Sequence, residues 1–309
     1  MKILSGTSNQ KLSKDISKQL KLKLVNTNIK RFADGEIYIE INENIRGNSV
    51  FVIQSTSNPA NDNLMELLLV IDALKSSSAK NITAVIPYYG YARQDRKVAP
   101  RTSISAKVVA NLLTNAGASR VVTVDLHAGQ IQGFFNIPVD ELTALPILTD
   151  YVKTKEIDDL VVVAVDIGIS KKARDVAARL NAPLAIIEKR RVGNNDTTET
   201  LNIIGDVKGK TALTFDDEID TGGTIVGAAD TLLERGVKEV FCCATHPVFS
   251  KNAHESLANS SFTEVVVSDS ISVDASRTKG KVKVLTVAPL LGEAIYRIHK
   301  GQSVGALFN

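Results

Sequence analysis

The stretch TALTFDDEIDTGGT, residues 211–224, decides the fold of the chain. Its first five residues form an apolar run that predicts a buried strand, and residues 225–235 carry apolar side chains at helical spacing. A turn that contains three aspartates, one glutamate and a Gly-Gly pair lies between them. The segment is therefore predicted to be a strand, an acidic turn and a helix.

The acidic turn has the residue types of a site for a sugar phosphate. Its Gly-Gly pair lets backbone N–H groups converge at the N-terminus of the helix, where the helix dipole favours a phosphate. The carboxylates beside it accept hydrogen bonds from a vicinal diol or hold a hydrated divalent cation. Ribose 5-phosphate carries both a phosphate and a diol. The simpler alternative is an acidic first turn that only complements the helix dipole. The candidate ligands are Asp216, Asp217, Asp220, Thr221, Gly222, Gly223 and Thr224.

The rest of the chain alternates between strand-like and helical segments. Apolar patterns predict strands at 50–53, 82–86, 120–124, 160–163, 184–187 and 239–241, and helices at 63–76, 104–115 and 291–299. This alternation is typical of the α/β class, with mainly parallel sheets flanked by helices. The chain is long enough for two domains. We expect them at 1–146 and 147–294, with segment 295–309 packing back on the first.

Composition and charge narrow the class of protein. The net charge of +3 and the pI near 8.7 are too mild to indicate a nucleic-acid partner. No apolar run approaches the length of a membrane span, and the N-terminal stretch lacks the apolar core of a signal peptide. Cys242 and Cys243 are adjacent in a predicted strand, which argues against a disulfide framework. We expect a cytoplasmic protein without a nucleic-acid or membrane partner.

A second polar cluster follows the predicted strand at 82–86. The loop PYYGYARQDRKVAPR, residues 87–101, combines Tyr and Gly with a dense run of Arg and Lys. Aromatic and guanidinium groups of this kind grip a nucleotide and its polyphosphate. The alternative is a basic loop that is only solvated. The candidate ligands of ATP here are Arg93, Gln94, Asp95 and Arg96.

These motifs resemble those of one enzyme family. The acidic turn is similar to the phosphoribosyl-pyrophosphate loop of type I phosphoribosyltransferases and of ribose-phosphate pyrophosphokinases. The basic loop closely matches the ATP-binding stretch of the pyrophosphokinases, and the resemblance extends over nearly the whole chain. It implies two tandem type I phosphoribosyltransferase-like domains. RFADGE, residues 31–36, resembles an adenine-binding loop that a neighbouring subunit lends, with Phe32, Asp34 and Glu36 at the matching positions.

The resemblance also implies roles for residues near other strand ends. Lys189 and Arg191 precede a polar stretch at 193–200 and match the family's catalytic pair. Basic residues at the root of a mobile loop can close over developing negative charge, although a solvated charged loop is the alternative. His127 matches a position that contacts metal-bound ATP, and Asp166 matches a metal position at the sugar side. The implied cofactor is Mg²⁺.

The reaction that the resemblance implies joins ATP and ribose 5-phosphate. The sugar 1-hydroxyl attacks the β-phosphorus of ATP, so the diphosphoryl group is transferred and AMP leaves. Such chemistry needs positioning and charge stabilisation more than covalent catalysis. The family further implies a homo-oligomer, a hexamer built from dimers. Two alternatives stay open, namely a non-catalytic regulatory paralogue and a phosphoribosyltransferase that consumes the activated sugar.

The sequence departs from the family pattern at several positions. Val165 and Ile169 replace a Pro and a Gly around Asp166. If the loop needs a positive φ at Ile169, its geometry must differ or strain must be stored. Arg46 and Ser303 match the family's regulatory phosphate or ADP site, but two hydroxyl donors of that site are missing. We expect activation by inorganic phosphate and inhibition by ADP to be weakened.

Overall fold

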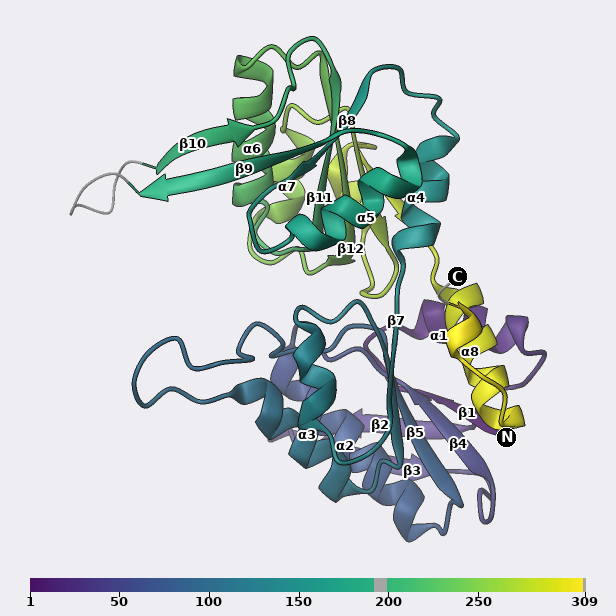
Figure 1. Ribbon diagram of the computed structural model, residues 1–309. Coiled ribbons are helices and arrows are strands. Elements are labelled where there is room, and N and C mark those ends of the chain that lie inside the picture. The colour runs from purple at the N-terminus through teal and green to yellow at the C-terminus, as the bar shows by residue number, and fades with distance from the viewer. Residues whose placement is uncertain (192–198, 308–309) are drawn as a thin grey trace. The chain divides into compact units, whose positions relative to one another are not determined.

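The computed structural model describes the backbone of residues 1–191 and 199–307, and their side chains outside 189–201. Two compact units make up the chain (Figure 1). The first comprises Met1–Ala144, Ser270–Ser272 and Thr286–Asn309, and the second comprises Leu145–Asp269 and Val273–Leu285. No helix in the described part of the chain is both long and apolar enough to cross a membrane.

The first unit contains a five-stranded parallel sheet and a separate two-stranded sheet. Its elements are β1 Lys2–Ser5, α1 Gln10–Gln19, β2 Thr27–Arg31, β3 Ile37–Ile41, β4 Ser49–Ile53, α2 Ala60–Ser76, β5 Asn81–Ile86, α3 Ser105–Ala116, β6 Arg120–Val124, η1 Gly129–Phe134, β7 Val139–Leu142, α8 Ala288–Lys300 and η3 Gly305–Leu307. The parallel sheet has the order β1-β4-β5-β6-β7. The strands and helices predicted in this unit are confirmed.

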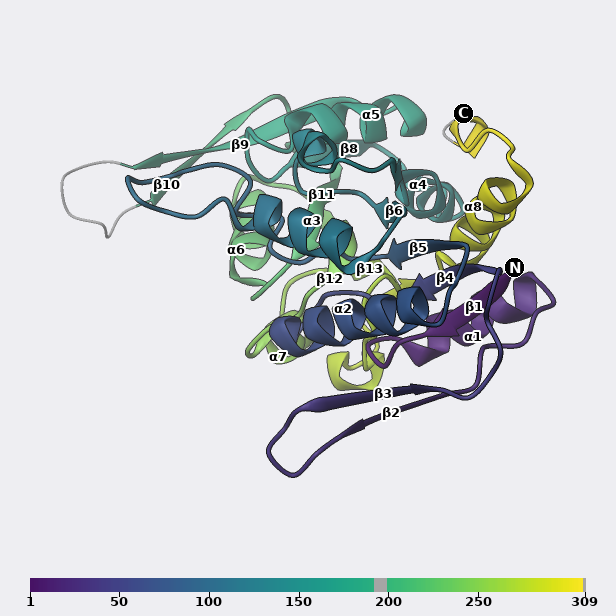
Figure 2. The same ribbon diagram turned by 90° about the horizontal axis from the view of Figure 1, so that it is seen from below.

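The helices of the first unit cover both faces of its parallel sheet. Leu24 pairs in parallel with Ile3 of β1, on the side away from β4, so the connection through α1 runs opposite to those through α2 and α3. Because such crossovers are right-handed, α1 lies on the face opposite to α2 and α3. It packs there beside α8 (Figures 1 and 2). Both faces of the Val- and Ile-rich strands are thereby buried.

The two-stranded sheet is an antiparallel hairpin of β2 and β3 that carries residues 31–36 at its tip. Ile29, Ile39 and Ile41 pack against the core of the first unit, whereas Lys30 and Glu40 are exposed. A search for continuous apolar runs misses such strands, because they alternate apolar and polar residues.

The second unit contains one seven-stranded sheet in the order β10-β9-β8-β11-β12-β13-β14, in which only the β9–β10 pair is antiparallel. Its elements are α4 Leu145–Lys153, β8 Leu160–Ala164, α5 Ser170–Leu180, β9 Leu184–Arg191, β10 Glu199–Ile204, β11 Thr211–Ile219, α6 Gly223–Glu234, β12 Glu239–Pro247, α7 Ala253–Ala258, β13 Glu264–Ser268, η2 Ala275–Thr278 and β14 Val282–Leu285. The helices α5 and α6 flank opposite faces, since their crossovers run in opposite directions from the centre of the sheet.

Several strands of the second unit run further than predicted. The predicted ends at Ile187 and Phe215 are wrong, because β9 continues to Arg191 and β11 to Ile219. The polar stretch predicted as a loop overlaps a strand at Glu199 and Thr200, which belong to β10. The strands continue through these charged residues because a neighbouring strand pairs with their backbone, as Ala244 of β12 does with Asp216.

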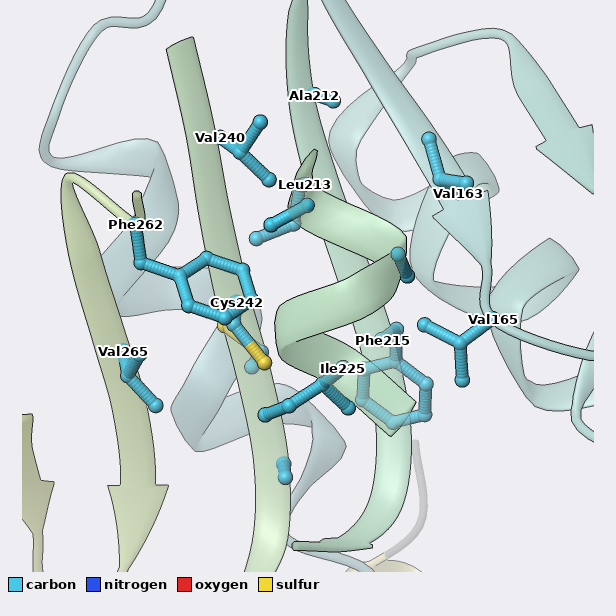
Figure 3. Packing of buried hydrophobic residues seen from close by; sticks show 14 of the residues in the cluster. Val163, Val165, Ala212, Leu213, Phe215, Ile225, Val240, Cys242, Phe262 and Val265 are labelled. Atoms are coloured by element: carbon cyan, nitrogen blue, oxygen red, sulfur yellow. The ribbon is translucent and has the colours of Figure 1, made fainter. Parts of the chain in front are cut away.

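Part of the core of the second unit lies between its central strands and α6. Figure 3 shows Leu213 and Phe215 of β11, Val240 and Cys242 of β12, and Ile225 of α6 gathered in it. Each of these five side chains is almost completely buried. Burial of a side chain of this size contributes about 1.5–3 kcal/mol, so the core holds the start of α6 firmly against the end of β11.

Candidate functional site

The loop after β5 is anchored by its aromatic start. Tyr88 and Tyr89 are buried, and the Tyr89 hydroxyl donates a hydrogen bond of 2.9 Å to the carbonyl of Ala106. The Gly90 N–H donates to Thr56 Oγ1 at 2.7 Å. A Cβ on Gly90 would lie 2.3 Å from the Thr56 carbonyl oxygen, so no side chain fits at this position. The chain passes tightly over the end of β4 and then leaves the sheet.

The predicted ATP ligands on this loop lie in its outward part. Arg93, Gln94 and Arg96 are exposed, which suits guanidinium groups that bind a polyphosphate. Asp95 is half-buried and accepts a hydrogen bond of 2.5 Å from Gln130 Nε2. Because Gln130 follows β6, this contact ties the basic loop to the loop that carries His127.

His127 lies on a loop that β7 holds in place. Its side chain is exposed just after the carboxyl end of β6. The preceding Asp125 has a positive φ of 39° and accepts a hydrogen bond of 2.9 Å from the Ala144 N–H. The Leu126 N–H donates to Glu141 Oε1 at 2.9 Å. The backbone on which His127 stands is therefore fixed, while its imidazole is accessible.

The hairpin tip exposes all three of its predicted ATP ligands. Phe32 is 49% exposed, and its ring meets Tyr38 edge to face with 5.6 Å between the centroids. Asp34 and Glu36 are exposed, and Asp34 Oδ1 accepts a hydrogen bond of 3.0 Å from the Glu36 N–H. A half-exposed phenyl ring at a hairpin tip is suited to stack on a base.

In the second unit, the first two acids of the predicted turn belong to strand β11. Asp216 is half-buried and Asp217 is buried. Burial, the hydrogen bond and charge of Asp217, and the charge of Asp166 all raise the pKa of the Asp216 carboxyl well above its usual range. Adjacent carboxylates that repel one another in this way favour a bound cation, which neutralises them. This observation fits a divalent ion near Asp166 and Asp216.

The true turn comprises Asp220, Thr221 and Gly222, and α6 begins at Gly223. Gly222 has a φ of 81°, which a residue with a Cβ adopts only with strain. Thr221, Gly223 and Thr224 are exposed around the first turn of α6. The structure thus brings the predicted residues together at a helix N-terminus, the arrangement that binds phosphate groups.

Sequence reasoning missed one residue of this region. Ser250 lies in the segment after β12, and its hydroxyl donates a hydrogen bond to Asp220 Oδ1. Its backbone N–H also donates to the Asp220 carbonyl at 3.0 Å. The strand was predicted only over 239–241, whereas β12 runs to Pro247, so Ser250 did not look like a residue at a strand end.

The loop of Asp166 is not strained by Ile169. Ile169 has a φ of −85°, and its N–H donates a hydrogen bond of 3.0 Å to Asp166 Oδ1. The branched side chain is therefore compatible with this backbone, and Asp166 itself is exposed. Within the described residues, no three His, Cys, Asp or Glu side chains are grouped as a complete metal site. Mg²⁺ commonly takes only one or two carboxylates and completes its shell with water and substrate phosphates.

The remaining predicted residues are less fully described. The backbone of Lys189 and Arg191 forms the end of β9, but their side chains lie outside the described residues, as does segment 192–198. Arg46 is exposed, and its N–H donates to Asn44 Oδ1 at 3.0 Å. The carbonyl of the exposed Ser303 accepts a hydrogen bond of 3.1 Å from Arg297.

Known proteins similar to this chain share both its sequence and its fold. The model of the N-terminal domain of ribose phosphate pyrophosphokinase matches residues 1–117, and that of the phosphoribosyl synthetase-associated domain matches 193–309. The ribose-phosphate pyrophosphokinase of Caldanaerobacter subterraneus is 56% identical, over 100% of this chain and 98% of that protein. The corresponding protein of Corynebacterium ammoniagenes is 53% identical, over 100% and 97%.

The likeness extends to a solved structure. The crystal structure of phosphoribosylpyrophosphate synthetase from Mycobacterium smegmatis matches with a TM-score of 0.92 at 42% identity, over 97% of this chain and 99% of that one. This match confirms the predicted α/β fold with two phosphoribosyltransferase-like domains. The chain belongs to the ribose-phosphate pyrophosphokinase family.

Proposed function

We propose that the chain is an active ribose-phosphate pyrophosphokinase, which transfers the β,γ-diphosphoryl group of ATP to the 1-hydroxyl of ribose 5-phosphate. The products are 5-phosphoribosyl 1-pyrophosphate, a precursor for nucleotide, histidine and tryptophan biosynthesis, and AMP. The observation that carries the proposal is the full-length similarity to ribose-phosphate pyrophosphokinases. The exposed basic loop in the first unit and the acidic strand end in the second suit the two substrates.

The first unit supplies the ATP ligands. Arg93 and Arg96 pair with the phosphate oxygens, because guanidinium groups bind such oxygens in a bidentate manner. Gln94 and Asp95 support the same loop. Phe32, with Asp34 and Glu36, receives the adenine from a neighbouring copy of the chain, as the exposed phenyl ring suggests.

The second unit binds the sugar phosphate. The backbone N–H groups from Thr221 to Thr224 hold the 5-phosphate at the start of α6. Asp220 and the Asp216–Asp217 pair accept hydrogen bonds from the sugar hydroxyls. His127 would contact the Mg²⁺ bound to ATP, and Asp166 would hold a second Mg²⁺ at the sugar side; such ions would neutralise phosphate charge and make the phosphorus more electrophilic.

Lys189 and Arg191 are the catalytic pair of the proposal. Their positive charges stabilise the charge that develops on the transferred group. No residue is assigned as a general base, since positioning and electrostatics carry most of such a reaction. The presence of both residues, and of all three aspartates, argues against a non-catalytic paralogue. The ATP-binding motifs of the first unit argue against a phosphoribosyltransferase.

The active form is proposed to be a cytoplasmic homo-oligomer, a hexamer built from dimers, because a lent hairpin requires at least two copies. Regulation at the site of Arg46 and Ser303 is proposed to be weak. The oligomer and the weak regulation are both proposed from the resemblance of this chain to the family.

The test is to measure AMP and phosphoribosyl pyrophosphate after incubation of the purified protein with ATP, ribose 5-phosphate and Mg²⁺. Reactions with and without added inorganic phosphate are compared. Product in both establishes the enzyme and supports weak regulation. Product only with phosphate supports the enzyme but contradicts weak regulation, and absence of product in both would favour the regulatory paralogue.

A further inference from the structure

Ser250 contacts the proposed sugar-phosphate clamp through both its backbone and its side chain. The Phe249 N–H donates a hydrogen bond of 3.0 Å to the carbonyl of Ile219, and the Ser250 N–H donates one of 3.0 Å to the carbonyl of Asp220. These two bonds continue the pairing of β11 and β12 beyond their last registered residues. The Ser250 hydroxyl adds a third bond, to Asp220 Oδ1. The carboxylate of Asp220 is thus held by the neighbouring strand end.

The backbone around Ser250 has a conformation that few residues adopt without support. Phe249 has a φ of 46° and Lys251 a φ of 52°, although neither is glycine. The Phe249 ring is buried and meets the His254 ring edge to face at 5.2 Å. The Ser250 carbonyl accepts a hydrogen bond of 3.1 Å from Ala253 at the start of α7. Such conformations persist where the surroundings over-determine them, and they are frequent at ligand clamps.

We infer that Ser250 is a positioning residue for ribose 5-phosphate, which acts by fixing the orientation of the Asp220 carboxylate. This inference rests on the proposed role of Asp220 in binding the sugar. A hydroxyl that donates to a carboxylate favours its ionised form and limits its rotation about the side-chain bonds. The sugar then meets a carboxylate that is already oriented, so less side-chain freedom is lost on binding.

The first test compares Ser250→Ala with Ser261→Ala. Ser261 is a matched control, because its hydroxyl also donates to an aspartate of the second unit, Asp230, at 2.7 Å. We expect Ser250→Ala to raise the KM for ribose 5-phosphate about tenfold, the loss typical of one charge-assisted hydrogen bond. The KM for ATP should stay within about twofold, and Ser261→Ala should leave both constants unchanged. Equal changes in both KM values for Ser250→Ala would overturn the inference, because they indicate a general structural effect.

The second test asks whether Ser250 acts through Asp220. We expect Asp220→Ala to raise the KM for ribose 5-phosphate by more than Ser250→Ala, and the double variant to be no worse than Asp220→Ala. If Asp220→Ala raises the KM and Ser250→Ala does not, the role of Ser250 is wrong while the clamp stands. If Asp220→Ala has no effect, the assignment of the sugar site itself is wrong.

A conservative variant covers the case in which Ser250→Ala unfolds the protein. Ser250→Cys keeps the backbone bonds and the size of the side chain but replaces the hydroxyl by a weak donor. We expect it to keep the thermal midpoint of the wild type. Its KM for ribose 5-phosphate should lie between the KM of the wild type and that of Ser250→Ala. A folded Ser250→Cys with the wild-type KM contradicts the inference.

Discussion

The two units place their candidate residues at strand ends in different ways. In the first unit, β5 and β6 stop where the apolar runs stop, and Arg93, Arg96 and His127 stand exposed on the loops that follow. In the second unit, β9 and β11 run on through the charged residues, so Lys189 and Asp216 belong to the sheet itself. Residues on an exposed loop can change without affecting the sheet. A half-buried carboxylate in a strand, by contrast, contributes to stability in a way that depends on pH, so the proposed sugar binding at Asp216 is expected to be coupled to both.

The largest expected effect falls on the strand end of the second unit. Lys189→Ala should lower kcat about 1,000-fold, which is the scale of losing one charge that stabilises a transition state. The KM values should change much less, and this split is measured with ATP and ribose 5-phosphate varied separately. Arg190→Ala is the control, since the neighbouring basic residue is assigned no direct role. Equal losses for the two variants would mean that total charge, not a specific residue, matters.

A smaller effect is expected where the basic loop of the first unit passes over the end of β4. Gly90→Ala would place a Cβ 2.3 Å from a backbone oxygen of Thr56. Neither backbone segment can give way easily, so we expect a loss of about 2–3 kcal/mol in the free energy of unfolding. Gly133→Ala is the matched control, because the added Cβ would have no atom within 4 Å other than those of the adjoining backbone. Denaturant titration of both variants measures the difference, and equal stability would show that the loop moves freely over β4.

The strand ends of the first unit can be predicted from the sequence more closely than those of the second unit, because only in the first unit do the strands stop where the apolar runs stop. Long Val- and Ile-rich runs locate β4, β5 and β6 within one residue of their observed bounds. The extent of β11 cannot be found in this way, because Asp216 and Glu218 look like the start of a loop. They continue the strand because β12 offers them partners, Ala244 and His246, and this partner lies elsewhere in the sequence. Tertiary pairing overrides local composition here.

The residues of the candidate site also differ in how well the sequence predicts them. A motif such as the acidic turn is visible because its residues are contiguous. Ser250 is a lone serine whose importance depends on a hydrogen bond to Asp220, 30 positions away along the chain. The pKa of Asp216 is raised mainly by burial and by Asp217, and the charge of Asp166, which follows the end of another strand, adds to this. Such interactions between separate segments can be recognised only when the fold is known.

The pH dependence of Asp216 tests the coupling between charge and stability in the second unit. Its pKa is raised on folding, so the folded state keeps a proton that the unfolded state loses above about pH 4. Stability therefore falls as the pH rises from this value towards the raised pKa. In Mg²⁺-free buffer, Asp216→Asn should remove this fall and be more stable than the wild type by about 1–2 kcal/mol at pH 8. The advantage should shrink towards pH 4.

Thermal unfolding at several pH values measures this effect. The control is Asp230→Asn, which changes an aspartate on the exposed side of α6 and should show no such trend. Asp216→Asn should also weaken ribose 5-phosphate binding, since stability and function are opposed at such a site. A pH-independent difference between Asp216→Asn and the wild type would contradict the electrostatic coupling.

The smallest expected effect concerns the exposed hairpin of the first unit. Phe32→Ala should raise the KM for ATP about tenfold through loss of stacking on the base, and it should spare both ribose 5-phosphate and thermal stability. Val108→Ala, which also shortens a half-exposed apolar side chain, is the control. An unchanged KM for ATP would remove the adenine assignment.

A mixing experiment then decides which chain uses the hairpin. If Phe32 is lent to a neighbour, a Phe32→Ala chain still has its own Lys189, and a Lys189→Ala partner supplies the intact phenyl ring. Mixed oligomers of these two impaired variants should therefore recover a normal KM for ATP at some of their sites. If Phe32 serves its own chain, every site in the mixture lacks one of the two residues and the KM stays high. Recovery would show that Phe32 is exposed because it completes the site of a neighbouring chain, whereas Asp216, Asp217 and Asp220 of the second unit are proposed to serve their own chain.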